Sequence, residues 1–197
     1  TLPHDVVDRL AQLRDTLTHL PYAAAHLERL ERHYQPGSGW ADAFAGVLAE
    51  LFADAGLVII DPRDRGFAGA MAHVHRTALL QAGAIADAMS ERVSALEAAG
   101  YEASIAIRTG APLSFFHPQA ADGPRYRLEP SGSAYSQVGG DGTHTTGELF
   151  AALDSDPLRF STSALLRPIL QDTLLPTAAY VGGPGEVAYF AQLAPLY

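Results

Sequence analysis

The residue types best suited to chemistry gather near the end of the chain. A short apolar run, residues 177–181, stops at the sequence Gly-Gly-Pro-Gly-Glu (182–186), and a helical pattern follows. A strand, a glycine turn and a helix start in this order leave backbone N–H groups free to bind an anion. Pro184 suits the first helical position because it has no N–H group to leave unpaired. The pattern therefore predicts an anion site built from the amides of Gly182, Gly183 and Gly185.

A simpler explanation of the turn stays open, in which its glycines only adopt positive φ in a tight loop. The turn has neither the lysine of a phosphate-binding loop nor the Gly-x-Gly-x-x-Gly spacing of dinucleotide sites. Glu186 complements the helix dipole but would repel a purely anionic ligand. A ligand that carries both signs of charge is expected, such as an amino acid or an amino sugar with acid groups.

A single arginine, Arg167, lies among apolar neighbours in the sequence Leu-Leu-Arg-Pro, and Pro168 favours a position at the start of a helix. A guanidinium in such a setting needs a partner. That partner is either Asp172 or Glu186 in a structural ion pair, or a ligand carboxylate or phosphate held by two hydrogen bonds. Gln171 and Asp172 would contact ligand hydroxyls or an amine, or would only cap and pair.

The remaining candidates for chemistry are less specific. His117 and His144 lie in a loop-rich region and could approach a ligand, but no pattern selects them. The histidines do not match the spacing of helical zinc motifs, and no metal is predicted. Ser161 and Ser163 lack the Gly-x-Ser-x-Gly sequence of a nucleophile elbow, so helix capping is the expected role.

Composition limits the function classes. The 197 residues carry a net charge of −9, which opposes general binding of nucleic acid. There is no cysteine, no apolar run long enough to cross a bilayer and no secretory signal segment. A cytoplasmic protein that does not bind membranes is expected. Because the sequence starts at Thr1 and ends without a polar tail, we expect a piece of a longer polypeptide.

Apolar periodicity predicts the elements that must position these residues. The expected fold class is α/β, a partial Rossmann-like parallel sheet with flanking helices, plus a helical insertion and a small hairpin insertion. The helical insertion is placed at 1–50, and the core at 51–197 with a loop or hairpin insertion at about 104–142. The expected parallel strands are 57–60, 104–108 and 177–181. The expected helices are 4–20, 22–34, a third capped by Ser38, a long one ending at Gly100, 146–153 and 165–174.

Near the C-terminus, the sequence around Arg167-Pro168, Gln171-Asp172 and Gly182–Glu186 resembles BshC, the family of cysteine-adding enzymes of bacillithiol biosynthesis. Segments around Asp61-Pro62 and Glu97–Tyr101 also resemble the family, so the similarity covers most of this chain but only a central segment of a family member. The matching residues near the C-terminus are Phe160-Ser161, Ala164–Pro168, Gln171-Asp172, Leu175–Thr177, Tyr180, Gly182–Glu186, Ala188-Tyr189 and Gln192-Leu193.

The resemblance implies a bacterial cytoplasmic ligase that joins L-cysteine to glucosaminyl malate in the last step of bacillithiol synthesis. It also implies a Rossmann-like core, a coiled coil in the full-length protein, a homodimer and use of ATP or ADP. This segment alone is expected to be inactive. Two alternatives stay open: a nucleotidyl- or glycosyl-transferase-like enzyme, and a non-catalytic binding or scaffolding domain.

Carried onto this sequence, the resemblance gives Arg167 and Glu186 catalytic roles. The residues expected to bind substrate or nucleotide are Gly182, Gly183, Gly185, Gln171, Asp172 and Tyr189.

Overall fold

The chain folds as two compact units, Thr1–Asp61 and Pro62–Tyr197. The structure is a computed structural model that describes all residues from 1 to 197. The sequence predicts a different kind of boundary at residue 50, between a helical insertion and a Rossmann-like core. That division stays a prediction.

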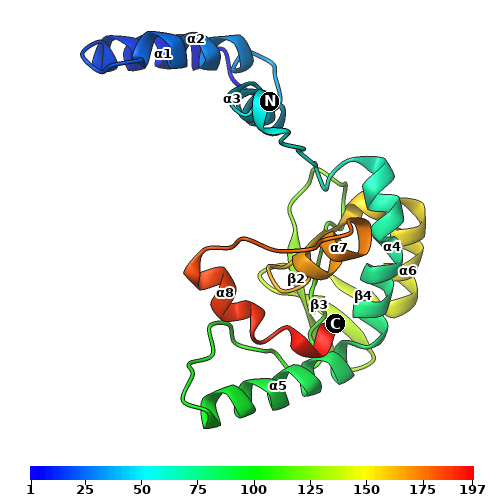
Figure 1. Cartoon of the computed structure of the whole chain (residues 1–197). Helices are drawn as coiled ribbons and strands as arrows, with labels where there is room; N and C mark the ends of the chain where they lie inside the picture. Colours follow the sequence, from blue (N-terminus) through cyan, green and yellow to red (C-terminus); the bar gives the residue numbers. More distant parts are fainter. The chain divides into compact units, whose positions relative to one another are not determined.

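The first unit is helical, as its 3.6-residue periodicity predicts (Figure 1). Helix α2 packs against both α1 and α3. A small core forms around Leu2, Val6 and Ala43. The expected cap at Ser38 is wrong, because Gly39 occupies the N-cap position and no side chain caps the helix. The elements are α1 (Val6–Leu17), α2 (Ala23–His33), α3 (Trp40–Leu51) and the 3₁₀ turn η1 (Ala53–Ala55).

The second unit contains an open five-stranded sheet in the order β4-β3-β2-β1-β5. Every neighbouring pair is antiparallel. Residues 131–142, within the loop or hairpin insertion expected at about 104–142, contain β3, because the turn at Gly132 (φ 61°) lets the chain reverse and pair with β2. The strands are β1 (Ser114–Phe116), β2 (Tyr126–Ser131), β3 (Ala134–Gln137), β4 (Thr143–Thr145) and β5 (Phe160–Thr162).

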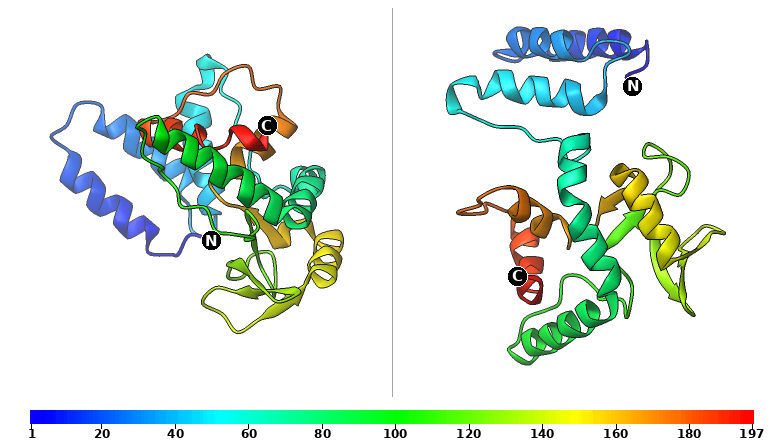
Figure 2. Two further views of the ribbon diagram at one scale, coloured as in Figure 1. Left: turned by 90° about the horizontal axis from the view of Figure 1, so that it is seen from below. Right: turned by 90° about the vertical axis from the view of Figure 1, so that its right-hand side faces the viewer.

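Helices cover this sheet and extend beyond it (Figure 2). One residue from each of three strands is buried with Leu149 and Leu153 of α6. These residues are Phe116 of β1, Leu128 of β2 and Phe160 of β5. Helix α4 lies beside α6 and also contacts α7. The elements are α4 (Arg65–Leu80), α5 (Ala82–Ala98), α6 (Thr146–Ser155), η2 (Pro157–Arg159), α7 (Arg167–Leu174), α8 (Pro184–Phe190) and η3 (Ala194–Leu196).

Helix boundaries follow local chemistry. The helix expected at 146–153 is confirmed as α6, where Thr145 and Glu148 form a reciprocal capping box. The single long helix expected to end at Gly100 is instead two helices that meet at Gln81. No helix has the length and apolar character needed to span a membrane.

The three runs expected to be parallel strands do not form β-ladders within this chain. Residues 57–60, 104–108 and 177–181 have no strand assignment. A parallel strand needs a neighbour to take its N–H and C=O groups. In the run 104–108, the Gln192 side chain takes the place of a neighbouring strand. It accepts hydrogen bonds from the N–H groups of Ser104 and Ile105 at 3.0 Å. The sheet of this chain is therefore antiparallel, contrary to the expected parallel one.

Candidate functional site

Helix α7 holds Arg167 at its first turn. The helix begins at Arg167 with Pro168 next, as the Leu-Leu-Arg-Pro sequence predicts. The Arg167 N–H donates to the Ser163 carbonyl at 3.1 Å. Leu166 and Leu170 are buried against α4, which fixes the helix on the body of the unit. The guanidinium therefore extends from a packed helix.

The Arg167 guanidinium joins α7 to the glycine turn and α8. Its Nη2 donates to the Tyr180 hydroxyl at 2.9 Å, to Glu186 Oε1 at 3.0 Å and to the Tyr189 hydroxyl at 3.1 Å. Its Nη1 donates to Gln171 Oε1 at 3.2 Å. Because Nη2 has only two protons for three oxygens, the two tyrosines and the carboxylate compete for it.

This network is partly open to solvent. The side chains of Arg167 and Glu186 are 37% and 41% exposed. A hydrogen bond from the Tyr180 hydroxyl, and then the charge of Arg167, lower the pKa of Glu186 below its ordinary value despite partial burial. Glu186 is therefore ionised at neutral pH. Glu186 is one of the two structural partners of Arg167 that the sequence left open. The ion pair between them is not in a dry interior.

The glycine turn brings its backbone close to this network. None of Gly182, Gly183 and Gly185 adopts positive φ, so conformational need does not explain them. At Gly182 a Cβ atom would lie 2.6 Å from the Tyr180 ring and 3.2 Å from Glu186 Cβ, whereas at Gly183 and Gly185 it would meet nothing within 4 Å. The N–H group of Gly182 donates no hydrogen bond within the chain, whereas the N–H group of Gly183 bonds to the Glu186 carboxylate and helps to lower its pKa. The turn thus offers the Gly182 N–H group as a donor beside the Glu186 carboxylate.

A hollow of about 300 Å³ lies beside the network, between α7 and residues 177–180. Gln171 and Asp172 line it. Asp172 takes no part in the Arg167 network, because its Oδ2 accepts from the Tyr197 hydroxyl at 2.7 Å. Burial, with help from Asp172, raises the pKa of Tyr197 to about 12. The Tyr197 hydroxyl is therefore neutral at neutral pH.

The structure brings together four of the predicted site residues: Arg167, Gln171, Glu186 and Tyr189. Sequence reasoning missed Tyr180 as a site residue, although it lies in the apolar run two residues before Gly182. The presence of a tyrosine in an otherwise apolar run could have pointed to it, because a buried tyrosine hydroxyl needs a hydrogen-bond partner.

The two loop histidines lie in other contacts. His117 is 7% exposed; its Nδ1 lies 2.9 Å from the Gly123 carbonyl and its Nε2 lies 3.0 Å from Ser161 Oγ. His144 contacts Gln137. Burial lowers the pKa of both imidazoles. No cluster of three histidine or acidic side chains is arranged to hold a metal ion.

Comparison with known proteins identifies the family to which this chain belongs. The family model described as "Bacillithiol biosynthesis BshC, N-terminal Rossmann-like domain" matches residues 1–197. The chain belongs to the BshC family. Membership confirms the resemblance drawn from the C-terminal residues, and with it the Rossmann-like, α/β character of the chain.

Curated relatives carry the same name. The chain is 40% identical over 168 residues to "Putative cysteine ligase BshC" of Koribacter versatilis, covering 85% of this chain and 31% of that protein. It is 36% identical over 194 residues to the protein of that name from Salinibacter ruber, covering 98% and 34%. The Halalkalibacterium halodurans protein is 33% identical over 171 residues, covering 86% and 31%. The chain spans about a third of the length of these BshC relatives.

Proposed function

We propose that the full-length protein is a carbon–nitrogen ligase that joins L-cysteine to glucosaminyl malate, the last step of bacillithiol synthesis. The observation that carries the proposal is the match of the whole chain to the BshC family. The Arg167 network supports it, because a guanidinium, a carboxylate and a free amide suit a ligand that has both acid and amine groups. We place this reaction in the cytoplasm and, for the full-length protein, in a homodimer.

In the proposed site, Arg167 exchanges one of its internal partners for a substrate carboxylate. The guanidinium is partly exposed and already shares Nη2 among three oxygens, so an incoming carboxylate replaces a shared bond. The free N–H group of Gly182, and that of Gly183 once Glu186 turns away from it, provide further donors for the same anion, a carboxylate or a phosphate. Gly185, Gln171 and Tyr189 complete the contacts, and Asp172 meets the ligand from the hollow beside α7.

Glu186 takes the opposite charge. Its pKa is held below the ordinary range, so it is better suited to hold an ammonium group than to remove a proton from one. Once Arg167 binds a substrate carboxylate, Glu186 is free to pair with the amine of the same or the second substrate. This exchange positions amine and carboxyl groups for amide formation.

Amide formation also needs an activated carboxyl group, for which we propose ATP as co-substrate. Attack of the amine on the activated carbonyl forms the carbon–nitrogen bond and releases the activating phosphate group. Where the anion held at the Gly182–Gly185 turn is a phosphate, its donors are the turn amides together with Arg167. The turn differs from a phosphate-binding loop in having no lysine, so its amides are the only donors that it offers.

We further propose that the two unpaired apolar runs, 57–60 and 177–181, become parallel strands in the full-length protein. Val58 is 79% exposed and Val181 is 96% exposed, which is unusual for β-branched residues in continuous apolar runs. Because the chain spans about a third of its relatives' length, the partner strands lie in the remainder of the protein.

The test of the function uses the full-length protein with L-cysteine, glucosaminyl malate and ATP. We expect bacillithiol to form only when all three are present. Arg167→Met and Glu186→Gln are each expected to lower turnover or substrate affinity. Product formation without ATP would remove the activation step, and unchanged turnover and affinity in both variants would remove the site assignment.

A further inference from the structure

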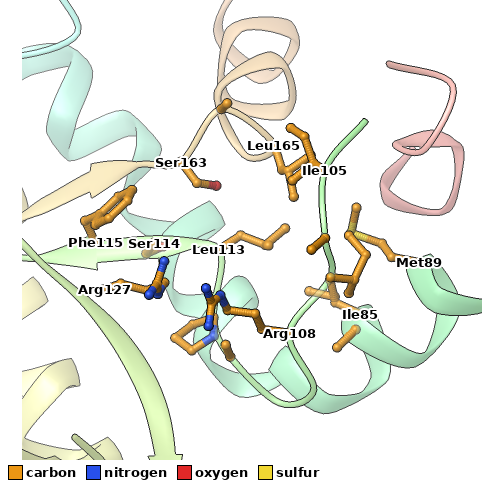
Figure 3. A pocket seen from close by; sticks show the side chains of 16 residues that line it. Ile85, Met89, Ile105, Arg108, Leu113, Ser114, Phe115, Arg127, Ser163 and Leu165 are labelled. Carbon is orange, nitrogen blue, oxygen red and sulfur yellow. The ribbon is translucent and has the colours of Figure 1, made fainter. Parts of the chain in front are cut away.

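A second site candidate lies away from the Arg167 network, in a cavity of about 180 Å³ in the second unit (Figure 3). Its walls are apolar and come from α5, the segment before β1 and the segment after β5. Ile85 and Met89 of α5 face Ile105, Leu113 and Leu165 across this space. The volume is below the roughly 300–1,000 Å³ of sites for drug-sized ligands. A ligand here has few heavy atoms.

Two arginines lie side by side at one end of this cavity, Arg108 from the segment before β1 and Arg127 from β2 (Figure 3). Both contact a single acceptor: Arg108 Nη1 lies 3.0 Å and Arg127 Nε lies 3.6 Å from Glu129 Oε1. Two guanidinium groups and one carboxylate leave one positive charge without a counter-charge in this group. The apolar cavity therefore has a cationic end.

One donor of the Arg127 guanidinium, its Nε group, lacks a hydrogen bond. Its Nε atom is buried and has no hydrogen-bond partner, and 3.6 Å to Glu129 is too long for one. A buried donor without an acceptor is costly, and native proteins keep few of them. The two serines that line the cavity do not supply the acceptor, because Ser114 Oγ pairs with His75 and Ser163 Oγ accepts from the Leu166 N–H.

We propose that this cavity binds a small monocarboxylate with an apolar body, its carboxylate at Arg108 and Arg127 and its body between α5 and Leu165. The carboxylate accepts from the Nη groups of Arg108 and Arg127, whose side chains are 54% and 37% exposed, and it neutralises the excess charge, while the hydrocarbon part removes apolar wall from water. The site is independent of the proposed ligase chemistry and shares no residue with the Arg167 network.

Hexanoate is the probe, and hexanamide is its uncharged match. Methyl-labelled methionine in the full-length protein gives a local readout: Met89 lines the cavity, whereas Met71 lies in the core between α4 and α7 and serves as the internal control. The variant Met89→Leu assigns the signal. We expect hexanoate to shift the Met89 signal and to leave the Met71 signal unchanged. Hexanamide should bind at least about tenfold more weakly than hexanoate.

Two variants with opposite expected effects separate binding from folding. Arg127→Met should weaken hexanoate binding about tenfold or more, whereas Glu129→Gln should tighten it severalfold because the carboxylate that competes for both arginines is gone. Arg76→Met is the matched control, since Arg76 lies outside the cavity and pairs with Asp154. If Arg127→Met fails to fold, Glu129→Gln alone decides.

The proposal is overturned if the Met89 signal does not respond to hexanoate, which would also be the result if the rest of the protein fills the cavity. Equal binding of hexanoate and hexanamide, or weaker hexanoate binding in Glu129→Gln, overturns it as well.

Discussion

Replacing Arg167 with methionine separates a structural arginine from a substrate-binding one. Methionine keeps the length and apolar contacts of the side chain but removes the charge and all five N–H donors. In the structure these donors serve Tyr180, Tyr189, Glu186 and Gln171. The variant therefore leaves four polar groups without their common partner.

The expected loss of stability is small. At most two of the three Nη2 contacts form at once, and together with the Nη1 contact they give three charge-assisted hydrogen bonds. Buried bonds of this kind contribute about 1.5–3 kcal/mol each, but more than a third of both Arg167 and Glu186 is exposed. Exposed ion pairs contribute about 0–1 kcal/mol. We therefore expect the free energy of unfolding to fall by about 1–2 kcal/mol.

The expected loss of activity is larger. If Arg167 holds a substrate carboxylate, kcat/KM for bacillithiol formation should fall about 100-fold or more, as when other preorganised donors are removed. Urea unfolding and product formation are measured on the same full-length variant. Arg76→Met is the matched control, because Arg76 is 36% exposed and also forms an ion pair, with Asp154. The reasoning is refuted if Arg167→Met retains kcat/KM within about threefold of wild type, or if the control loses as much.

Three further predictions concern local chemistry. Burial lowers the pKa of His75 to about 4 from about 6.5, so between these pH values the unfolded chain binds a proton that the folded chain does not. The contribution of His75 to the free energy of unfolding is therefore full above pH 6.5 and falls by about 3 kcal/mol as the pH drops toward 4. In His75→Asn, the free energy of unfolding measured with urea should depend less on pH over this range. An unchanged pH dependence would contradict the assignment. Gly182→Ala should lower activity because its Cβ would lie 2.6 Å from the Tyr180 ring, whereas Gly183→Ala should keep it; equal activity of the two in the ligase assay would argue against close approach at the turn. Thr145→Ala should lower the free energy of unfolding by about 1 kcal/mol through loss of the capping box, with activity retained; no change in urea unfolding would count against the cap.

Local signals in the sequence predicted several elements well. The helix at 146–153, the start of α7 at Arg167-Pro168 and the start of α8 at Pro184 each follow from a few residues whose chemistry fits one place in a helix. The pairing of Arg167 with Glu186 was also among the expected partners, because few acids were available to a guanidinium in that setting.

Long-range features were less accessible. The apolar runs at 57–60 and 177–181 read as buried parallel strands, but whether such a run forms a ladder depends on a neighbour that no local pattern reveals. The strand β3 was missed because Ala134–Gln137 is short and mostly polar, and its pairing with β2 decides its conformation. Tyr180 was missed for a related reason: only the folded turn brings its hydroxyl to Arg167.

A crystal structure of the full-length protein with L-cysteine and glucosaminyl malate tests the central assignment most directly. We predict a substrate carboxylate within hydrogen-bond distance of the Arg167 guanidinium and of the Gly182 or Gly183 amide, with Glu186 turned toward an ammonium group. Substrates bound elsewhere, with the Arg167–Glu186 pair still closed at about 3.0 Å, would contradict it.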